Sequence, residues 1–126
     1  MFTFANFSQQ FTGDEWPIFV ALAADENSYR ISLRIDPTIR WFNGHFPGQP
    51  ILPGVVQTHW AASLSCYGFG LGDDFARLEN LKFQTMVLPA TELTLTLEYR
   101  PDKQSVAFVY KNNDTLFSEG KLAFAV

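Results

Sequence analysis

The two histidines of the chain, His45 and His59, both lie in a stretch without Asp, Glu, Lys or Arg that runs from Trp41 to Gly72. An imidazole takes up or releases a proton near neutral pH, so histidine serves as a general base or acid. A lone buried histidine is most often a hydrogen-bonded core residue. Two histidines in one uncharged segment instead favour a catalytic site, because titratable side chains in apolar surroundings concentrate at such sites.

His45 belongs to a loop that is rich in proline and glycine. Residues 43–54 read NGHFPGQPILPG and contain three prolines and three glycines. Proline fixes one backbone angle and glycine adopts angles that other residues avoid, so we expect this loop to hold the His45 side chain in one direction. The loop leads directly to the start of a predicted helix, where free backbone N–H groups can bind a carbonyl oxygen or an oxyanion.

The predicted helix runs from Gly54 to Gly68 and is the only clear helix in the pattern. Pro53 and Gly54 suit its start, and Gly68 suits its end. The helix carries no charged residue. We therefore expect it to be buried on every side.

Most of the remaining chain has the pattern of β-strands. Between Ser28 and Asp36 apolar and polar residues alternate, which is typical of an antiparallel strand with one buried face. Further strands are predicted at 18–24, 76–88, 93–99, 105–111 and 116–126, with a hairpin turn at 112–114. One apolar helix and several antiparallel strands predict an α+β protein with an antiparallel sheet wrapped around the helix, which is the hot-dog fold.

The length of 126 residues suits a single hot-dog domain over residues 1–126. A small sheet around one helix leaves an apolar edge or face, so we expect a dimer. The formal net charge is −4 and no two basic residues are adjacent, which argues against binding of nucleic acid.

The sequence also predicts a cytoplasmic protein. Residues 1–13 lack the basic and apolar regions of a signal peptide, and the apolar window 55–72 is too polar to span a membrane. The only cysteine, Cys66, cannot form an internal disulfide, and we expect it to be a buried, reduced thiol.

The loop and the helix start resemble a known signature. Residues 44–55 read GHFPGQPILPGV, which resembles the signature of the 3-hydroxyacyl-[acyl-carrier-protein] dehydratases of fatty acid synthesis. The similarity continues at Lys82, Phe83, Val87 and Pro89, and it covers roughly residue 31 to the C-terminus. The string WFNGH at residues 41–45 looks most like the dehydratases of aryl polyene biosynthesis.

This resemblance implies the conversion of a 3-hydroxyacyl thioester to the trans-2-enoyl thioester. In the family the loop histidine, here His45, takes the proton from C2. Backbone N–H groups at the helix start, here those of Gly54 and Val55, polarise the thioester carbonyl. The position fourteen residues after the loop histidine, on the central helix of the partner subunit, assists departure of the 3-hydroxyl, and here it is His59.

The chain departs from the family pattern at two positions. The family has Glu or Asp where this chain has His59; an imidazolium can also donate a proton to a leaving hydroxyl. Two imidazoles close together in apolar surroundings disfavour double protonation, so we expect a changed activity or pH dependence. Ser63 stands where the family usually has Gln, and it either hydrogen-bonds to His59 across one helical turn or simply packs.

Five residues are candidates for contact with the substrate: Phe46, Pro53, Trp60, Ser63 and Phe83. For Trp60 core packing is the better explanation. Two histidines and one cysteine do not form a metal site, and we expect no cofactor.

The implied partners are an acyl group on acyl carrier protein or coenzyme A, and a second copy of the chain or a paralogue. An acidic carrier protein requires cations on the enzyme. The available cations are Arg40, Arg77, Lys82 and Arg100.

Two other functions stay open. A hot-dog thioesterase generally uses a carboxylate near the helix, and none occurs between Trp41 and Gly72. Alternatively, the chain binds acyl thioesters without catalysis, as one half of a heterodimer with an active paralogue, because His59 replaces the acid.

Overall fold

The computed structural model of the chain describes residues 2–43, 48, 50–72 and 75–124. Its elements comprise two α-helices, two short 3-10 helices and six strands within this part of the chain. In chain order they are α1 (Phe4–Gln10), β1 (Ile18–Asp25), β2 (Ser28–Arg34), η1 (Arg40–Phe42), α2 (Gly54–Phe69), β3 (Phe75–Phe83), β4 (Glu92–Arg100), η2 (Pro101–Lys103), β5 (Ser105–Asn112) and β6 (Thr115–Phe124).

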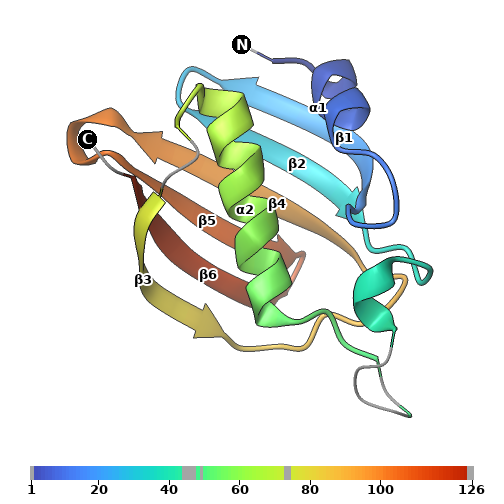
Figure 1. Cartoon of the computed structure of the whole chain (residues 1–126). Helices are drawn as coiled ribbons and strands as arrows, with labels where there is room; N and C mark the ends of the chain where they lie inside the picture. Colours follow the sequence, from blue (N-terminus) through green and yellow to red (C-terminus); the bar gives the residue numbers. More distant parts are fainter. Residues whose placement is uncertain (1, 44–47, 49, 73–74, 125–126) are drawn as a thin grey trace.

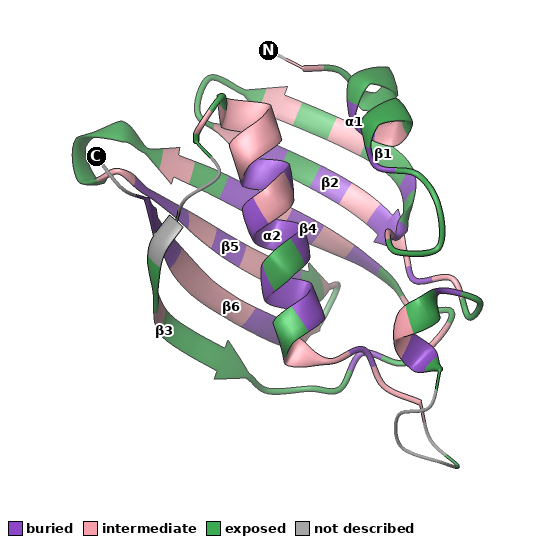
Figure 2. Cartoon of the chain, viewed as in Figure 1, coloured by how far each residue is buried: buried purple, intermediate pink, exposed green. Residues whose placement is uncertain are grey.

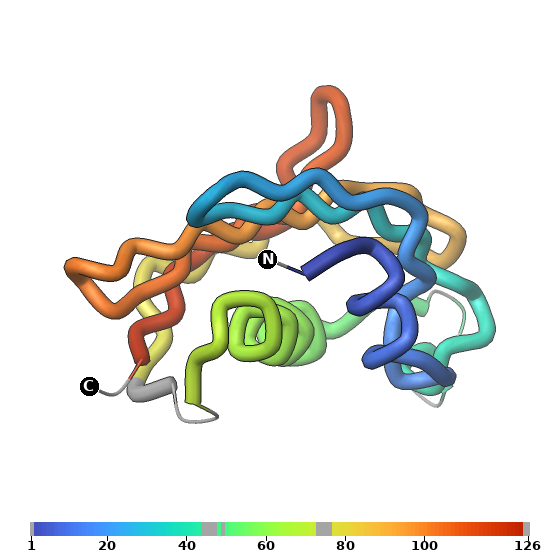
Figure 3. The backbone as a smooth tube through the Cα atoms, turned by 90° about the horizontal axis from the view of Figure 1, so that it is seen from above, coloured from blue at the N-terminus to red at the C-terminus, as the bar shows by residue number. Residues whose placement is uncertain are grey.

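All six strands form one antiparallel sheet in the order β1-β2-β4-β5-β6-β3. The sheet arches over α2, which lies along its concave side (Figure 1). Seen from above, α1 lies on the same side of the sheet as α2 (Figure 3). This arrangement confirms the predicted α+β hot-dog fold.

Alternation along the strands places the core between the sheet and α2. On β2, and on β4 as far as Leu97, every second residue is buried, and Ile31 pairs with Leu95 in the register of the two strands. From the helix side, Trp60 and Leu64 have no exposed surface. The strands predicted at 18–24, 28–36, 93–99 and 105–111 are therefore confirmed to within two residues at each end. The strand predicted at 116–126 is confirmed as far as residue 124, and residues 125–126 lie outside the described residues. The hairpin turn predicted at 112–114 is found at 113–114.

The helix ends at Phe69, one residue later than the sequence predicted. Gly70, not Gly68, adopts the left-handed conformation at the C-terminus of α2, with φ of 67°. Its N–H bonds to the carbonyl of Cys66, as is usual for a glycine cap. Gly68 is instead required for close packing, since a Cβ there would lie 2.8 Å from the ring of Tyr29.

A second helix, α1, was missed by the sequence prediction. Thr3 caps its N-terminus, and Asn6 completes a reciprocal capping box with the Thr3 backbone. The pattern was inconspicuous because α1 has only seven residues and one buried side chain, Phe7. Packing of Phe7 against Tyr29 and Tyr67 holds this short helix in place.

The prediction that α2 is buried on every side was wrong for the single chain. Val55 is 76% exposed and His59 is exposed as well, whereas Val56, Trp60 and Ala61 are buried. The physical reason is that the sheet covers one side of α2, and the opposite side has no covering element among the described residues (Figures 2 and 3). The absence of charged residues on α2 therefore reflects both its buried side and an apolar side that is exposed in the single chain.

The prediction of a strand over 76–88 was wrong at the C-terminal end of the strand. β3 stops at Phe83, because the next amides, those of Gln84 and Thr85, both turn to the carbonyl of Phe117. β3 is an edge strand, and Leu78, Leu81 and Phe83 on it are partly exposed, so it has the apolar edge that the sequence predicted.

Two smaller observations concern the remaining expectations. Cys66 is half-buried rather than buried, and its Sγ lies 3.1 Å from the carbonyl oxygen of Gly72. In the described part of the chain, no helix combines the length and the apolar character needed to cross a membrane.

Candidate active site

The start of α2 has two backbone N–H groups without a partner among the described residues, as the sequence predicted. Pro53 is the N-cap, and its carbonyl accepts the N–H groups of Val56 and Gln57. The N–H groups of Gly54 and Val55 precede these bonds and have no partner within the described residues. Within the described part of the chain, the positive end of the helix dipole therefore presents two donors, and the first turn has no acidic residue.

A buried polar network fixes this helix start to the sheet. The Gln57 amide donates through Nε2 to the carbonyl of Leu52 at 3.1 Å and accepts at Oε1 from Ser118 at 2.6 Å. The Tyr110 hydroxyl donates to the backbone carbonyl of Gln57 at 2.6 Å. Burial raises the pKa of Tyr110 well above its ordinary value, while a backbone hydrogen bond with Ala61 acts in the opposite direction. This network was not predictable from the sequence, because its hydrogen-bonded partners are up to 61 residues apart.

Phe83 lies directly on the first residue of α2. A Cβ added to Gly54 would be 2.8 Å from Cε1 of the Phe83 ring, so only glycine allows this contact. Phe83 is itself 50% exposed. The two residues line a hollow of about 240 Å³ at the helix start. The hollow is lined by Ile51, Leu52, Gly54, Gln57, Phe83, Gln84, Thr85 and Met86.

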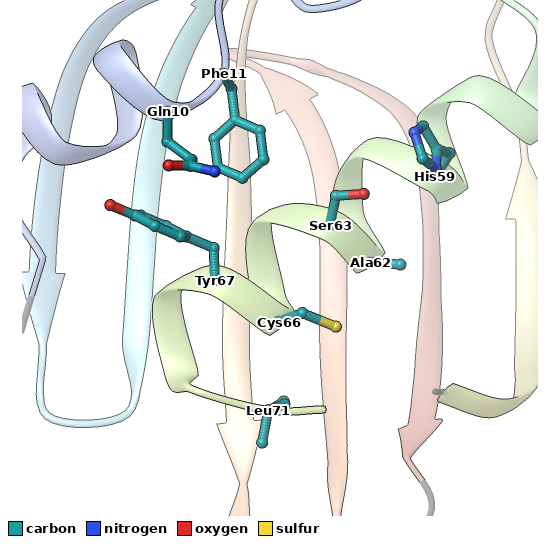
Figure 4. Close-up of a pocket in the computed structure, with 8 residues that line it drawn as sticks. All are labelled: Gln10, Phe11, His59, Ala62, Ser63, Cys66, Tyr67 and Leu71. Atoms are coloured by element: carbon teal, nitrogen blue, oxygen red, sulfur yellow. The ribbon is translucent and has the colours of Figure 1, made fainter. Parts of the chain in front are cut away.

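A larger groove of about 440 Å³ follows the uncovered side of α2. Five of its residues belong to α2 and share one side of the helix, because their spacing repeats every three or four positions. They are His59, Ala62, Ser63, Cys66 and Tyr67. The other wall comes from the end of α1 and the residue after it (Figure 4). The groove is lined by Gln10, Phe11, His59, Ala62, Ser63, Cys66, Tyr67 and Leu71.

His59 stands at one end of this groove (Figure 4). Its ring stacks on the indole of Trp16, with ring centroids 5.5 Å apart and an angle of 28° between the planes. Ser63 lies one turn further along α2 and lines the same groove, but no hydrogen bond joins it to His59 in the part of the chain described. Trp16 was not found by sequence analysis, because it lies 43 positions before His59 without any recognisable motif.

The other predicted site residues have different positions. His45, the proposed base, and Phe46 both lie outside the described residues. Pro53 is half-buried at the N-cap of α2. Trp60 is fully buried, and its indole N–H donates to the carbonyl of Glu15 at 2.8 Å, so its position fits core packing better than contact with a substrate.

No group of three or more His, Cys, Asp or Glu side chains that could hold a metal ion occurs among the residues that the structure describes. The functional groups of the groove and the helix start are imidazole, hydroxyl, thiol and carboxamide groups and backbone donors. Such groups suit proton transfer next to a polarised carbonyl.

Comparison with known families matches residues 21–121 to the model of the ApeI-like family, which is described as ApeI dehydratase. This range contains the loop, α2 and four of the six strands in full, with most of β1 and β6. The chain belongs to the ApeI-like family. The resemblance to aryl polyene dehydratases that residues 41–45 suggested is thereby confirmed at the level of the family.

Curated relatives of this ApeI-like chain include two named 3-hydroxyacyl-[acyl-carrier-protein] dehydratase FabZ. The protein of Fusobacterium nucleatum subsp. nucleatum is 35% identical over 92 residues, which cover 68% of this chain and 62% of the relative. That of Acetivibrio thermocellus is 31% identical over 96 residues, covering 68% of this chain and 66% of the relative. The chain thus spans slightly less than two thirds of the length of these relatives.

Two solved structures are similar to this ApeI-like chain over most of their length. The dehydratase heterocomplex ApeI:P from Xenorhabdus doucetiae contains a chain that is 33% identical, with a TM-score of 0.78, and the match covers 86% of this chain and 96% of that one. An uncharacterised protein from Erwinia carotovora subsp. atroseptica is also 33% identical, with a TM-score of 0.69 and coverage of 86% and 94%. The dehydratase domain of a mycocerosic acid synthase-like polyketide synthase, 17% identical with a TM-score of 0.66, shares the fold.

Proposed function

We propose that the chain is a dehydratase that converts a 3-hydroxyacyl thioester on acyl carrier protein to the trans-2-enoyl thioester. The observation that carries the proposal is the pair of backbone N–H groups at Gly54 and Val55, which have no partner in the described structure and lie on the same uncharged helix as His59. The family and the names of the curated relatives support it. An aryl polyene type of acyl chain is the form of substrate that the family match favours.

Each group has a defined task in the proposed reaction. The amides of Gly54 and Val55 bind the thioester carbonyl oxygen, which makes the C2 proton more acidic and stabilises the developing enolate. His45 removes that proton, and the electrons of the C2–H bond form the C2–C3 double bond. As the C3–O bond breaks, the imidazolium of His59 donates a proton to the oxygen, which leaves as water. One proton is accepted and one is donated, and exchange with solvent restores both histidines.

The proposal includes a second chain, which packs on the side of α2 that faces away from the sheet. The large exposed apolar residues of this region include Val55, Phe83 and Met86, which are 76%, 50% and 57% exposed. They adjoin the open edge of β3, where unpaired backbone groups can continue the sheet into another chain. In a dimer of identical chains, His45 of one copy would act together with His59 of the other.

A heterodimer with a paralogue is the second candidate assembly. The specific observation in its favour is His59, which stands where related dehydratases carry an acid. In addition, the similar chain from Xenorhabdus doucetiae belongs to a dehydratase heterocomplex. In that case the paralogue supplies the acid, and this chain alone binds acyl thioesters without converting them. A thioesterase has less support, because α2 carries no carboxylate.

Docking of an acidic carrier protein requires cations near the site. Of the four candidates from the sequence, Arg40, Arg77 and Arg100 have carboxylate neighbours within 3.5 Å. Lys82 is exposed and has no ion pair among the described residues, and it precedes Phe83. We therefore propose Lys82 as the carrier contact. The proposal also includes a cytoplasmic location, which the single cysteine supports because Cys66 cannot form an internal disulfide.

The test is an assay of the purified chain with a 3-hydroxyacyl thioester on acyl carrier protein, alone and with candidate paralogues. Mass spectrometry follows loss of water from the acyl group, and a thiol reagent follows hydrolysis. The dehydratase proposal expects dehydration without thiol release, and loss of dehydration in His45→Ala. Thiol release without an enoyl product would contradict it. Dehydration only in the presence of a paralogue would identify the heterodimer.

A further inference from the structure

The segment between α1 and β1 connects the two parts of the proposed site. The backbone carbonyl of Glu15 accepts two indole N–H groups, from Trp41 and from Trp60, each at 2.8 Å. Trp41 belongs to η1, which precedes the loop of His45, and Trp60 follows His59 on α2. One peptide group therefore holds Glu15 against both elements, and it fixes the position of the next residue, Trp16.

Charged groups strengthen this connection. The Arg40 guanidinium donates from Nε and Nη2 to Oδ1 of Asp14, at 3.1 and 2.8 Å, and Nη1 lies 3.3 Å from Oε1 of Glu15. The backbone N–H of Arg40 also donates to the carbonyl of Asp14. The hydrogen bond to Asp14 is the main cause that raises the pKa of Arg40. Residues 14 and 15 are thus bound to η1 through both backbone and side chain.

Trp16 contacts His59 from this fixed position. The indole stacks on the imidazole at 5.5 Å between centroids, and its own position is supported by Phe11 at 4.8 Å. This separation lies within the range of favourable aromatic pairs. An exposed histidine otherwise has several rotamers, and its two ring nitrogens change direction with each of them. A stacked neighbour restricts the plane of the ring and therefore the direction in which it can donate a proton.

We propose that Trp16 is a positioning residue for His59, which it holds by stacking in the orientation needed to protonate the leaving hydroxyl. This inference rests on the proposed function, because it assigns His59 the role of acid. Trp16 lies before residue 21, where the family match begins. It acts through His59 and not by contact with the substrate.

The test combines kinetics with spectroscopy on Trp16→Ala, Trp16→Phe and His59→Gln, with Phe4→Ala as an exposed aromatic control on α1. We expect Trp16→Ala to lower kcat about tenfold with little change in KM, because orientation and not binding is lost. Trp16→Phe should restore most of kcat, since a phenyl ring still stacks. In the His59→Gln background, Trp16→Ala should cause no further loss. NMR of the His59 ring should show an upfield ring-current shift that disappears in Trp16→Ala.

The outcomes separate this inference from the proposed function. If His59→Gln is inactive but Trp16→Ala keeps full kcat, the positioning role is refuted and the acid role stands. If both lose activity and their effects multiply in the double variant, Trp16 acts independently of His59 and the inference is again refuted. If His59→Gln keeps full activity, the acid role itself fails. Trp16→Phe provides a folded variant should Trp16→Ala lose stability.

Discussion

The hydroxyl of Ser118 on β6 donates a 2.6 Å hydrogen bond to Oε1 of Gln57, in the first turns of α2, and both side chains are buried. The amide Nε2 of Gln57 also donates to Leu52, just before the helix. The amides of Gly54 and Val55 therefore belong to a helix start that is bound to the sheet through side chains. Their direction is set before any substrate binds, which is the requirement for stabilising an oxyanion.

Ser118→Ala should destabilise the protein by about 1–3 kcal/mol, because it leaves the Gln57 oxygen buried without its donor. Thermal or urea unfolding measures this change. Ser65→Ala is the matched control: its hydroxyl is buried with no partner within the described structure, so its removal should be neutral or stabilising. Equal destabilisation by the two substitutions would contradict a specific role for the Ser118 hydrogen bond.

The raised pKa of Tyr110 predicts that the folded protein loses stability in alkaline solution. Its pKa is raised in the folded protein by burial, so between the unfolded pKa near 10 and the folded pKa only the unfolded state loses the proton. The free energy of unfolding is then unaffected by this group below about pH 10 and falls by up to about 1.4 kcal/mol per pH unit above it. Tyr110→Phe should flatten this decrease, at a cost of about 1 kcal/mol at neutral pH. An unchanged alkaline slope, measured by denaturant unfolding, would contradict the assignment.

Gly54→Ala should force the Phe83 ring away from the helix start, since the new Cβ would lie 2.8 Å from it. The expected cost is about 1 kcal/mol, because a half-exposed ring can move. Adding Phe83→Ala should remove the clash, so the double variant should be more stable than the sum of the single effects predicts. Gly120→Ala provides a comparison: its Cβ would meet the fully buried Phe108, so it should cost more than Gly54→Ala. Additive effects at positions 54 and 83 would show that the contact is absent.

The sequence predicted the strands and α2 well because their signals are local. Alternation from Ser28 onwards and the uncharged run around His59 are visible within a few residues of each position. The end of β3 was not visible in this way, because it depends on the Phe117 carbonyl, which lies more than thirty positions further along the chain.

The candidate site was predictable only in part for the same reason. The motif at residues 44–55 predicted the helix start with its two free amides, and α2 presents His59 at the surface. The residues that support these groups, Gln57 with Ser118 and Trp16 with His59, are brought together by the fold from distant positions. Burial of α2 was overestimated because an uncharged helix can face either a core or another chain.

The most direct test of the account mixes two inactive variants, His45→Ala and His59→Ala, and measures dehydration of a 3-hydroxyacyl thioester. Half of the randomly reassorted dimers contain one chain of each kind, and one of their two sites has both histidines, so activity should return to about a quarter of the wild-type level. Native mass spectrometry would verify that mixed dimers form. If mixed dimers form and remain as inactive as either variant alone, the pairing of His45 and His59 across two copies is contradicted.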